Sequence, residues 1–132
     1  MTLMADDDRE ISATQVKAML NNGEPLQLVD CRESLETDFV GIEGALLVPV
    51  SELVNRLKEL EPYRQGQVVF FCHHGIRSLR IIPWLRQQGF SGALSMAGGI
   101  DNWSEEIDPS VQRYRFDFEG LSPLEASEDD PV

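Results

Sequence analysis

Short apolar runs recur along this chain of 132 residues, and polar residues, glycine or proline separate them. Runs of this length and setting predict buried strands. Strands are therefore expected over residues 26–29, 45–48, 67–71 and 93–96. The run at 67–71 gives the strongest prediction, because its last four positions are all apolar, as the centre of a parallel sheet requires.

Helical patterns lie between these runs. Ser12 and Gln15 have the spacing of a capping box ahead of apolar Val16, which predicts a helix that ends at Asn22 and Gly23. A brief helix is expected after Asp30 and Glu33, and two more over residues 77–88 and 100–106. Ser51 is expected to cap a further helix, which has Leu53, Leu57 and Leu60 on one face.

The helix expected over residues 77–88 contains Pro83. An interior proline removes a backbone hydrogen bond and costs about 3 kcal/mol. We therefore expect either a kink at this position or a helix that begins only after it.

Strands that alternate with helices pair in parallel, and the helices then cover both faces of the sheet. The sequence predicts an α/β protein with one domain at residues 11–108. The ligand crevice of such a sheet lies beyond the carboxyl ends of its strands, where Cys72 follows the run at 67–71. Residues 1–10 are expected to be an acidic, flexible end, and residues 109–132 an extension with an acidic tail.

Part of the C-terminal extension has the pattern of a half-buried strand. Tyr114, Phe116 and Phe118 alternate with charged residues, so the three rings share one face. Burying each ring is worth roughly 1.5–3 kcal/mol, which favours docking on the domain or on a second copy. Residues from about Ser122 onward are expected to be mobile.

The chain is acidic, but its charge is unevenly distributed. A formal net charge of −12 disfavours binding to nucleic acid or to an anionic membrane surface. Residues 63–90 nevertheless contain no acidic residue and favour a small anionic ligand. Their four arginines are Arg64, Arg77, Arg80 and Arg86.

Cysteine content and the chain start bear on location. Cys31 and Cys72 are too few and too far apart for a disulfide scaffold, a thioredoxin-type dithiol or a zinc finger, and they favour a reducing compartment. The first residues lack the basic and apolar regions of a signal peptide. No run approaches the roughly 20 apolar residues of a membrane helix. The sequence thus predicts a cytoplasmic protein that does not enter a membrane.

Cys72 is placed for nucleophilic chemistry, because a loop and a helix follow the strand that precedes it. Successive backbone N–H groups in such a loop can form a nest for the thiolate, which is the reactive form. Gly75 permits a positive φ, Arg77 can close the loop or bind an anionic donor, and Ser78 can donate a hydrogen bond to the sulfur. The alternative is a buried strand residue without chemistry, since cysteine is often buried.

The loop Cys72-His73-His74-Gly75-Ile76-Arg77-Ser78 resembles the active-site loop of rhodanese-like domains, in which a cysteine is followed by a glycine, an arginine and a serine or threonine. Three further segments resemble family motifs and occur in family order: residues 28–33, 44–50 and 98–103. Two departures stand out. Residues 40–44 lack the histidine that is frequent there, and Cys31 stands where valine is usual.

The resemblance implies a five-stranded parallel sheet flanked by helices, and a catalytic cycle through a persulfide on Cys72. Sulfane sulfur would pass from thiosulfate or another persulfide donor, a small anionic molecule, to a thiophilic acceptor such as a thiol-bearing protein. No cofactor is expected. Asp30 and Arg32 resemble family positions near the loop, although a helix cap and a surface ion pair explain them equally well.

Two other functions stay open from the sequence. One is a non-catalytic or relay adaptor module that binds a partner protein. The other is phosphatase or arsenate reductase chemistry, whose loops have a Cys-x5-Arg pattern and cradle a tetrahedral oxyanion. The spacing from Cys72 to Arg77 is Cys-x4-Arg, and this shorter loop fits a single terminal sulfur better.

Several residues have competing interpretations. His73 and His74 are expected to line the pocket mouth and to bind no metal, because adjacent side chains diverge. Cys31 either resolves the persulfide as a disulfide partner or fills an apolar position. Trp84 and Trp103 are expected in the core. The sequence leaves the sulfur donor and acceptor, the pathway and the oligomeric state open.

Overall fold

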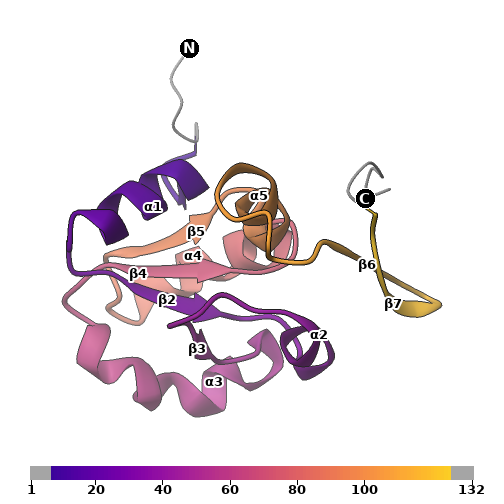
Figure 1. Ribbon diagram of the computed structural model, residues 1–132. Coiled ribbons are helices and arrows are strands. Elements are labelled where there is room, and N and C mark those ends of the chain that lie inside the picture. The colour runs from indigo at the N-terminus through magenta and orange to yellow at the C-terminus, as the bar shows by residue number, and fades with distance from the viewer. Residues whose placement is uncertain (1–6, 126–132) are drawn as a thin grey trace.

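The computed structural model describes residues 7–125, and it shows an α/β domain built on one parallel sheet (Figure 1). The five strands lie in the order β1-β5-β4-β2-β3, and every neighbouring pair is parallel. The fold class expected from the sequence is confirmed. The strands of this sheet are β1 (Glu10–Ile11), β2 (Gln27–Asp30), β3 (Leu46–Leu47), β4 (Val68–Phe71) and β5 (Ala93–Met96).

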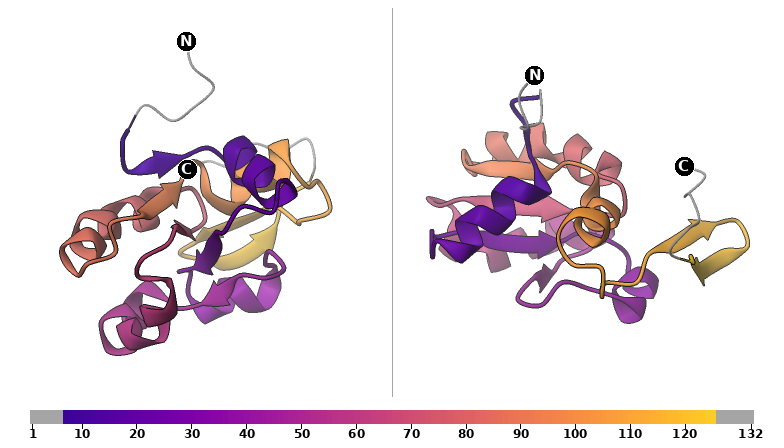
Figure 2. Two further views of the ribbon diagram at one scale, coloured as in Figure 1. Left: turned by 90° about the vertical axis from the view of Figure 1, so that its left-hand side faces the viewer. Right: turned by 45° about the horizontal axis from the view of Figure 1, so that its top comes forward.

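Helices cover both faces of the sheet (Figure 2). Side chains of β4 alternate between two apolar clusters, with Val68 and Phe70 beneath α3 and α4, and Val69 and Phe71 beneath α1 and α5. All four are fully buried, as a central strand requires. The helices are α1 (Ala13–Asn21), α2 (Ser34–Phe39), α3 (Leu53–Arg56), α4 (Ile76–Gln87) and α5 (Gly99–Glu106), with 3-10 turns η1 (Val50–Glu52) and η2 (Leu57–Tyr63).

The capping box expected at the start of α1 is confirmed. The Ser12 hydroxyl accepts the Gln15 N–H at 3.1 Å, and the Gln15 side chain accepts the Ser12 N–H at 3.4 Å. The cap expected at Ser51 is wrong, because its hydroxyl donates to the Glu33 carboxylate at 2.9 Å. Residues 50–63 therefore form η1, α3 and η2 in place of one regular helix.

Helix α4 runs without interruption from Ile76 to Gln87 and contains Pro83. The expectation that the helix begins only after the proline is wrong. Pro83 is exposed, whereas the neighbouring Ile82 and Leu85 are fully buried and hold the helix on the sheet. Burial of this apolar side stabilises the helix despite the missing backbone bond.

The chain ends pack more closely than the sequence suggested. Glu10 belongs to β1 and pairs with Ser95, so the flexibility expected for residues 1–10 is wrong at Glu10; residues 1–6 lie outside the described part. At the other end, β6 (Tyr114–Asp117) and β7 (Gly120–Pro123) form an antiparallel hairpin. β7 extends to Pro123 and Leu124 is buried, so the mobility expected from Ser122 onward is wrong for these residues; residues 126–132 lie outside the described part.

The three aromatic rings of the extension have different environments. Tyr114 is buried and Phe116 is half-buried in the domain's own apolar cluster, which confirms docking on the same chain for these two. Phe118 lies at the hairpin turn and is fully exposed, so its expected burial is wrong. Within residues 7–125, none of the helices has the length and apolar character to cross a membrane.

Candidate active site

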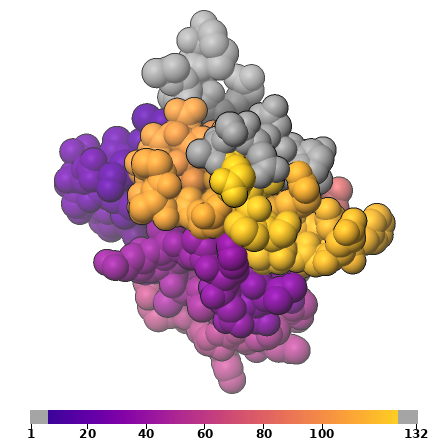
Figure 3. Space-filling view, turned by 45° about the vertical axis from the view of Figure 1, so that its right-hand side comes forward, coloured from indigo at the N-terminus to yellow at the C-terminus, as the bar shows by residue number. Residues whose placement is uncertain are grey.

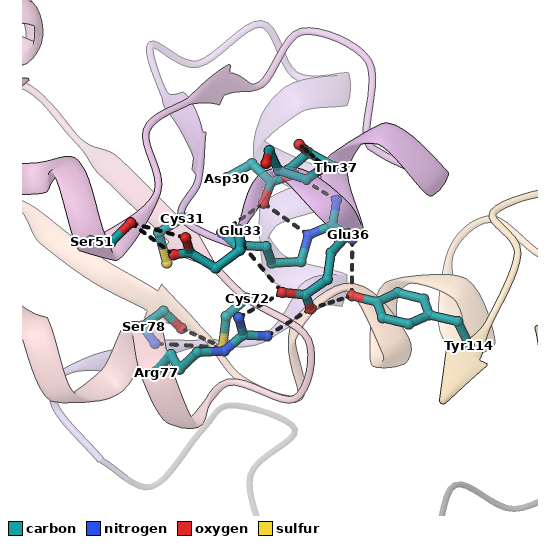
Figure 4. Close-up of polar contacts among 12 residues, drawn as sticks. Asp30, Cys31, Glu33, Glu36, Thr37, Ser51, Cys72, Arg77, Ser78 and Tyr114 are labelled. Carbon is teal, nitrogen blue, oxygen red and sulfur yellow. Dashed lines mark hydrogen bonds and ion pairs between the residues drawn. The ribbon is translucent and has the colours of Figure 1, made fainter. Parts of the chain in front are cut away.

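Cys72 directly follows β4 at the carboxyl end of the sheet and is 1% exposed. Its Sγ accepts the Gly75 N–H at 3.1 Å, the Ser78 N–H at 3.5 Å and the Ser78 hydroxyl at 3.5 Å (Figure 4). Three donors therefore converge on one sulfur atom, in the arrangement expected of an anion nest. Such donors favour negative charge on the sulfur.

The hydroxyl of Ser78 is held by a second serine. Ser78 and Ser95 are fully buried, and their Oγ atoms lie 2.6 Å apart. Ser95 belongs to β5, the strand beside β4, so the sheet itself fixes the serine next to the sulfur. Nothing in the local sequence around Ser95 indicated this contact.

Gly75 provides the turn from the cysteine into α4. Its φ of +93° lies in the left-handed region that favours glycine, and it immediately precedes Ile76, the first residue of the helix. A Cβ at this position would approach the backbone nitrogen of Gly98 to 3.0 Å. Gly75 is thus required for both its dihedral angle and its close packing.

The start of α5 closes the loop from the other side. The N–H groups of Ile100 and Asp101 donate to the carbonyl oxygens of Cys72 and His73, at 2.9 and 3.1 Å. Gly99 has φ +60°, and a Cβ there would lie 2.5 Å from both carbonyl oxygens. Only glycine allows this approach of α5 to the loop.

Arg77 is paired with an acidic side chain that the sequence did not indicate. Its two terminal nitrogens donate to the two carboxylate oxygens of Glu36 in α2, each at 2.8 Å. Burial alone would raise the pKa of Glu36, but the ion pair with Arg77 and a hydrogen bond from Tyr114 outweigh it and lower that pKa. Arg77 is therefore compensated in its resting position.

The other three arginines of residues 63–90 do not line the pocket beside Cys72. Arg64 pairs with Glu61 at 2.8 Å, and Arg86 donates to the Ala93 carbonyl oxygen and lies 3.9 Å from Asp8. Arg80 is exposed on α4. Of these four arginines, Arg77 is the one that lines the pocket beside Cys72, and the small anionic ligand expected from the charge distribution stays a prediction.

Asp30 and Arg32 form a buried ion pair, with 2.6 Å between the Arg32 Nη2 and the Asp30 Oδ2 and no exposed side-chain area. Neither a surface ion pair nor a helix cap describes them, because Glu33 caps α2. Arg32 also donates to the hydroxyl of Tyr114 at 3.0 Å, and that hydroxyl donates to Glu36 at 2.8 Å. Asp30 and Arg32 thus connect through Tyr114 of the C-terminal hairpin and Glu36 to Arg77, which follows Cys72 in the loop.

The side chains of His73 and His74 were expected to diverge, but they lie side by side. Their ring centroids are 3.9 Å apart, and His73 also stacks on Tyr114 at 3.9 Å with 4° between the ring planes. His74 is half-buried at the pocket. Ligand atoms of His73, His74 and Asp101 lie within 4.8 Å of one another, but Arg113 holds the Asp101 carboxylate at 2.9 Å, so we assign no metal to them.

A pocket of about 330 Å³ opens beside the cysteine. Its lining residues are Cys72, His73, His74, Ile76, Arg77 and Phe116. Ile76 is half-exposed at the start of α4, and Phe116 comes from the hairpin. A larger hollow of about 560 Å³ lies between α5 and the hairpin base, but no cysteine or histidine lines it, so the smaller pocket is the candidate site.

Cys31 has the environment of a core residue. Its side chain is fully buried, and its Sγ donates to the Phe71 carbonyl oxygen at 3.2 Å. Burial raises the pKa of the Cys31 thiol well above its ordinary value, so it stays protonated and is a poor nucleophile. This environment favours the apolar role over that of a disulfide partner. The tryptophans agree with expectation, since Trp103 is buried and Trp84 packs partly buried against the core.

The structure thus shows a parallel α/β domain in which a hydrogen-bonded thiol lines a pocket directly after the central strand β4. The model of the rhodanese-like domain matches residues 12–106. The chain therefore belongs to the rhodanese-like domain family.

Known proteins of two kinds are similar to this chain. A probable adenylyltransferase/sulfurtransferase, MoeZ of Mycobacterium tuberculosis, is 33% identical over 105 residues, which cover 79% of this chain and 26% of MoeZ. The chain thus spans about a quarter of that relative. A rhodanese-related protein from Thermoplasma volcanium superposes with a TM-score of 0.66 at 31% identity, covering 75% of this chain and 93% of that one. The human single-domain sulfurtransferase TSTD1 superposes with a TM-score of 0.63 at 28% identity, covering 76% of this chain and 98% of that one.

Proposed function

We propose that this protein is a sulfurtransferase that carries sulfane sulfur as a persulfide on Cys72. The observation that carries the proposal is the convergence of three donors on a single thiol at the floor of a pocket. Membership of the rhodanese-like family supports it, as do the sulfurtransferase names of two similar proteins. The proposed donors are thiosulfate or the persulfide of another molecule. The proposed acceptors are thiols, including those of a partner protein, and cyanide in vitro.

The proposed reaction has two displacement steps. The Cys72 thiolate attacks the outer sulfur of the donor, forming an S–S bond as the donor's own bond to that sulfur breaks. With thiosulfate, sulfite leaves with the bonding electron pair. The acceptor then attacks the outer sulfur of the persulfide, and Cys72 leaves as the thiolate, for which the amides of Gly75 and Ser78 are in place. Sulfur changes carrier without an external oxidant or reductant.

Intact-mass measurement after thiosulfate treatment tests the assignment to Cys72. We expect one added sulfur atom in the wild type and in Cys31→Ser, and none in Cys72→Ser. Cys31→Ser is the matched control because it removes the second of two cysteines, one whose sulfur donates to a backbone carbonyl. A gain of sulfur that persists in Cys72→Ser would refute the proposal.

The adaptor function makes the opposite prediction. A module that only binds would capture its partner equally well as Cys72→Ser and would show no turnover with thiosulfate and cyanide. Phosphatase or arsenate reductase chemistry is the less favoured alternative, because the loop from Cys72 to Arg77 is one residue shorter than a Cys-x5-Arg loop. Release of phosphate from an aryl phosphate by the wild type, but not by Cys72→Ser, would favour that alternative.

A further inference from the structure

The C-terminal hairpin lies beyond residues 12–106, which match the family, and yet it reaches the candidate site. Tyr114 and Phe116 are two positions apart on β6, so both side chains point to the same side of the hairpin. Tyr114 contacts His73 of the loop, and Phe116 lines the pocket that contains Cys72. Figure 3 shows the hairpin (yellow) against the purple segment that holds α2 and beside the orange segment that holds α5.

We propose that Phe116 determines which molecules reach Cys72, and that Tyr114 is the positioning residue that holds it there. The substrate class rests on the proposed function. For a sulfurtransferase, this arrangement favours sulfur carriers that are slender. Thiosulfate and short alkyl persulfides belong to that class. Carriers with a bulky group next to the reacting sulfur are disfavoured.

Tyr114 is fixed by contacts on every part of its side chain. Its ring stacks on His73 and meets the ring of Phe39 edge-on at 5.8 Å. Its hydroxyl accepts from Arg32 and donates to Glu36, and burial raises the pKa of Tyr114, so the donated proton is retained (Figure 4). Its backbone carbonyl oxygen lies 3.0 Å from the His73 Nε2. A residue held this way defines the position of the next residue on the same face.

The base of the hairpin is fixed as well. Arg113 forms an ion pair with Asp101 of α5 at 2.9 Å, and the Leu124 N–H donates to the Arg113 carbonyl oxygen at 2.9 Å. The Ser104 hydroxyl donates to the Val111 carbonyl oxygen at 2.5 Å. The hairpin is therefore a built part of the domain surface at its base, while its turn projects away.

Shape has more influence than charge in this pocket. Among the described residues that line it, Arg77 is the only arginine or lysine, and Glu36 already compensates it with two hydrogen bonds. Ile76 and Phe116 supply apolar walls that leave about 330 Å³ of space, at the small end of the range for ligand pockets. Trimming Phe116 is expected to widen the approach to Cys72 without changing any group that hydrogen-bonds to the sulfur.

Alkylation of Cys72 tests the wall without requiring sulfur transfer. The variants Phe116→Ala and Phe118→Ala are compared with the parent in a Cys31→Ser background, using iodoacetamide and a dye-bearing iodoacetamide. The readout is the alkylation ratio, which is the rate with the dye-bearing reagent divided by the rate with iodoacetamide. We expect Phe116→Ala to raise this ratio by about tenfold or more. Phe118→Ala, the matched control at the exposed hairpin turn, is expected to leave the ratio unchanged. Phe116→Leu serves if the alanine variant does not fold, with a smaller shift in the same direction.

An unchanged ratio in folded Phe116→Ala or Phe116→Leu, or an equal change in Phe118→Ala, would overturn the proposal. Alkylation that discriminates by size in a protein that never accepts sulfur from thiosulfate would refute the proposed function alone. Comparing the rates of sulfur transfer from thiosulfate and from a bulky aryl persulfide tests the same size preference with sulfur carriers.

Tyr114→Phe tests the positioning role, because it keeps the stacked ring and removes only the hydroxyl. We expect its alkylation ratio to move toward that of Phe116→Ala. Tyr63→Phe is the matched control, since Tyr63 packs on the opposite apolar cluster. A loss of stability in Tyr114→Phe with no change of the ratio would show a purely structural role and overturn this part of the proposal.

Discussion

Loss of the ion pair between Arg77 and Glu36 is expected to destabilise the site substantially. The Glu36 side chain is fully buried, whereas that of Arg77 is 34% exposed. Removing one partner of a fully buried pair costs about 3–5 kcal/mol, and an exposed pair contributes about 0–1 kcal/mol. Arg77→Ala leaves the buried carboxylate with the Tyr114 hydroxyl but without its cation. We therefore expect a loss of about 2–3 kcal/mol near neutral pH.

The size of this loss should depend on pH. In the wild type, burial acts to raise the pKa of Glu36, but Arg77 and Tyr114 reverse the effect and lower it. The stability from the pair is then fully present above the unfolded-state pKa of about 4.3, and it is lost as the pH falls through the lower folded-state value. In Arg77→Ala the opposing cation is absent, so we expect the pKa of Glu36 to rise and the buried acid to become neutral at higher pH. The gap between the two proteins should narrow on acidification.

Urea unfolding at about pH 8 and about pH 5 measures this gap, and both values lie above the isoelectric point of about 4.4. A loss of 2–3 kcal/mol lowers the unfolding midpoint by roughly 1–2 M. Arg80→Ala is the matched control, because Arg80 is exposed on the same helix, and its expected change is within about 0.5 kcal/mol. Thiosulfate turnover should fall far more in Arg77→Ala than in Arg80→Ala. Equal losses of stability in the two variants, or a gap that does not change with pH, would refute the reasoning.

Two further variants test the loop itself. Gly99→Ala should lower the free energy of unfolding by about 2–4 kcal/mol, because its Cβ would lie 2.5 Å from the Cys72 carbonyl oxygen. Gly44 also has a positive φ but has open space around it, so Gly44→Ala should lower it by only about 1 kcal/mol. Thermal unfolding compares the two variants, and equal shifts would exclude the contact as the cause. Ser78→Ala should slow iodoacetamide alkylation of Cys72 severalfold, because the sulfur loses one of three donors, while Ser51→Ala should not; an unchanged rate in Ser78→Ala would exclude this role for its hydroxyl.

Elements with strong local signals were predictable, and elements made by tertiary pairing were not. The apolar run of β4 and the capping box at Ser12 identify their elements without reference to the rest of the chain. β1 has only two residues, Glu10 and Ile11, so it has no periodicity to detect, and it exists because β5 offers an open edge. Ser51 has the residue type of a helix cap, but a carboxylate 18 positions away accepts its hydroxyl.

The site divides along the same line. The loop from Cys72 to Ser78 was predictable, because its residues act on one another over a few positions. Glu36 was not, since its role depends on α2 meeting α4 across 41 positions of sequence. Tyr114 gave a partial signal through the aromatic alternation of the extension, which indicates burial but not the partner. Sequence spacing thus locates Cys72 and its loop, whereas the groups that hold their surroundings come from the packing of distant elements.

The buried ion pairs limit what a count of arginines says about the pocket. Asp30 and Arg32 form one ion pair, Glu36 and Arg77 form another, and the Tyr114 hydroxyl joins the two. Charges are retained in a protein interior when they are paired, so the positive charge beside the loop is matched before any donor arrives. An anionic donor would therefore be attracted only weakly by Arg77, because the carboxylate of Glu36 already neutralises its charge. In the proposed reaction, the loop amides and the Ser78 hydroxyl therefore stabilise the Cys72 sulfur anion, and Phe116 of the hairpin selects among sulfur carriers.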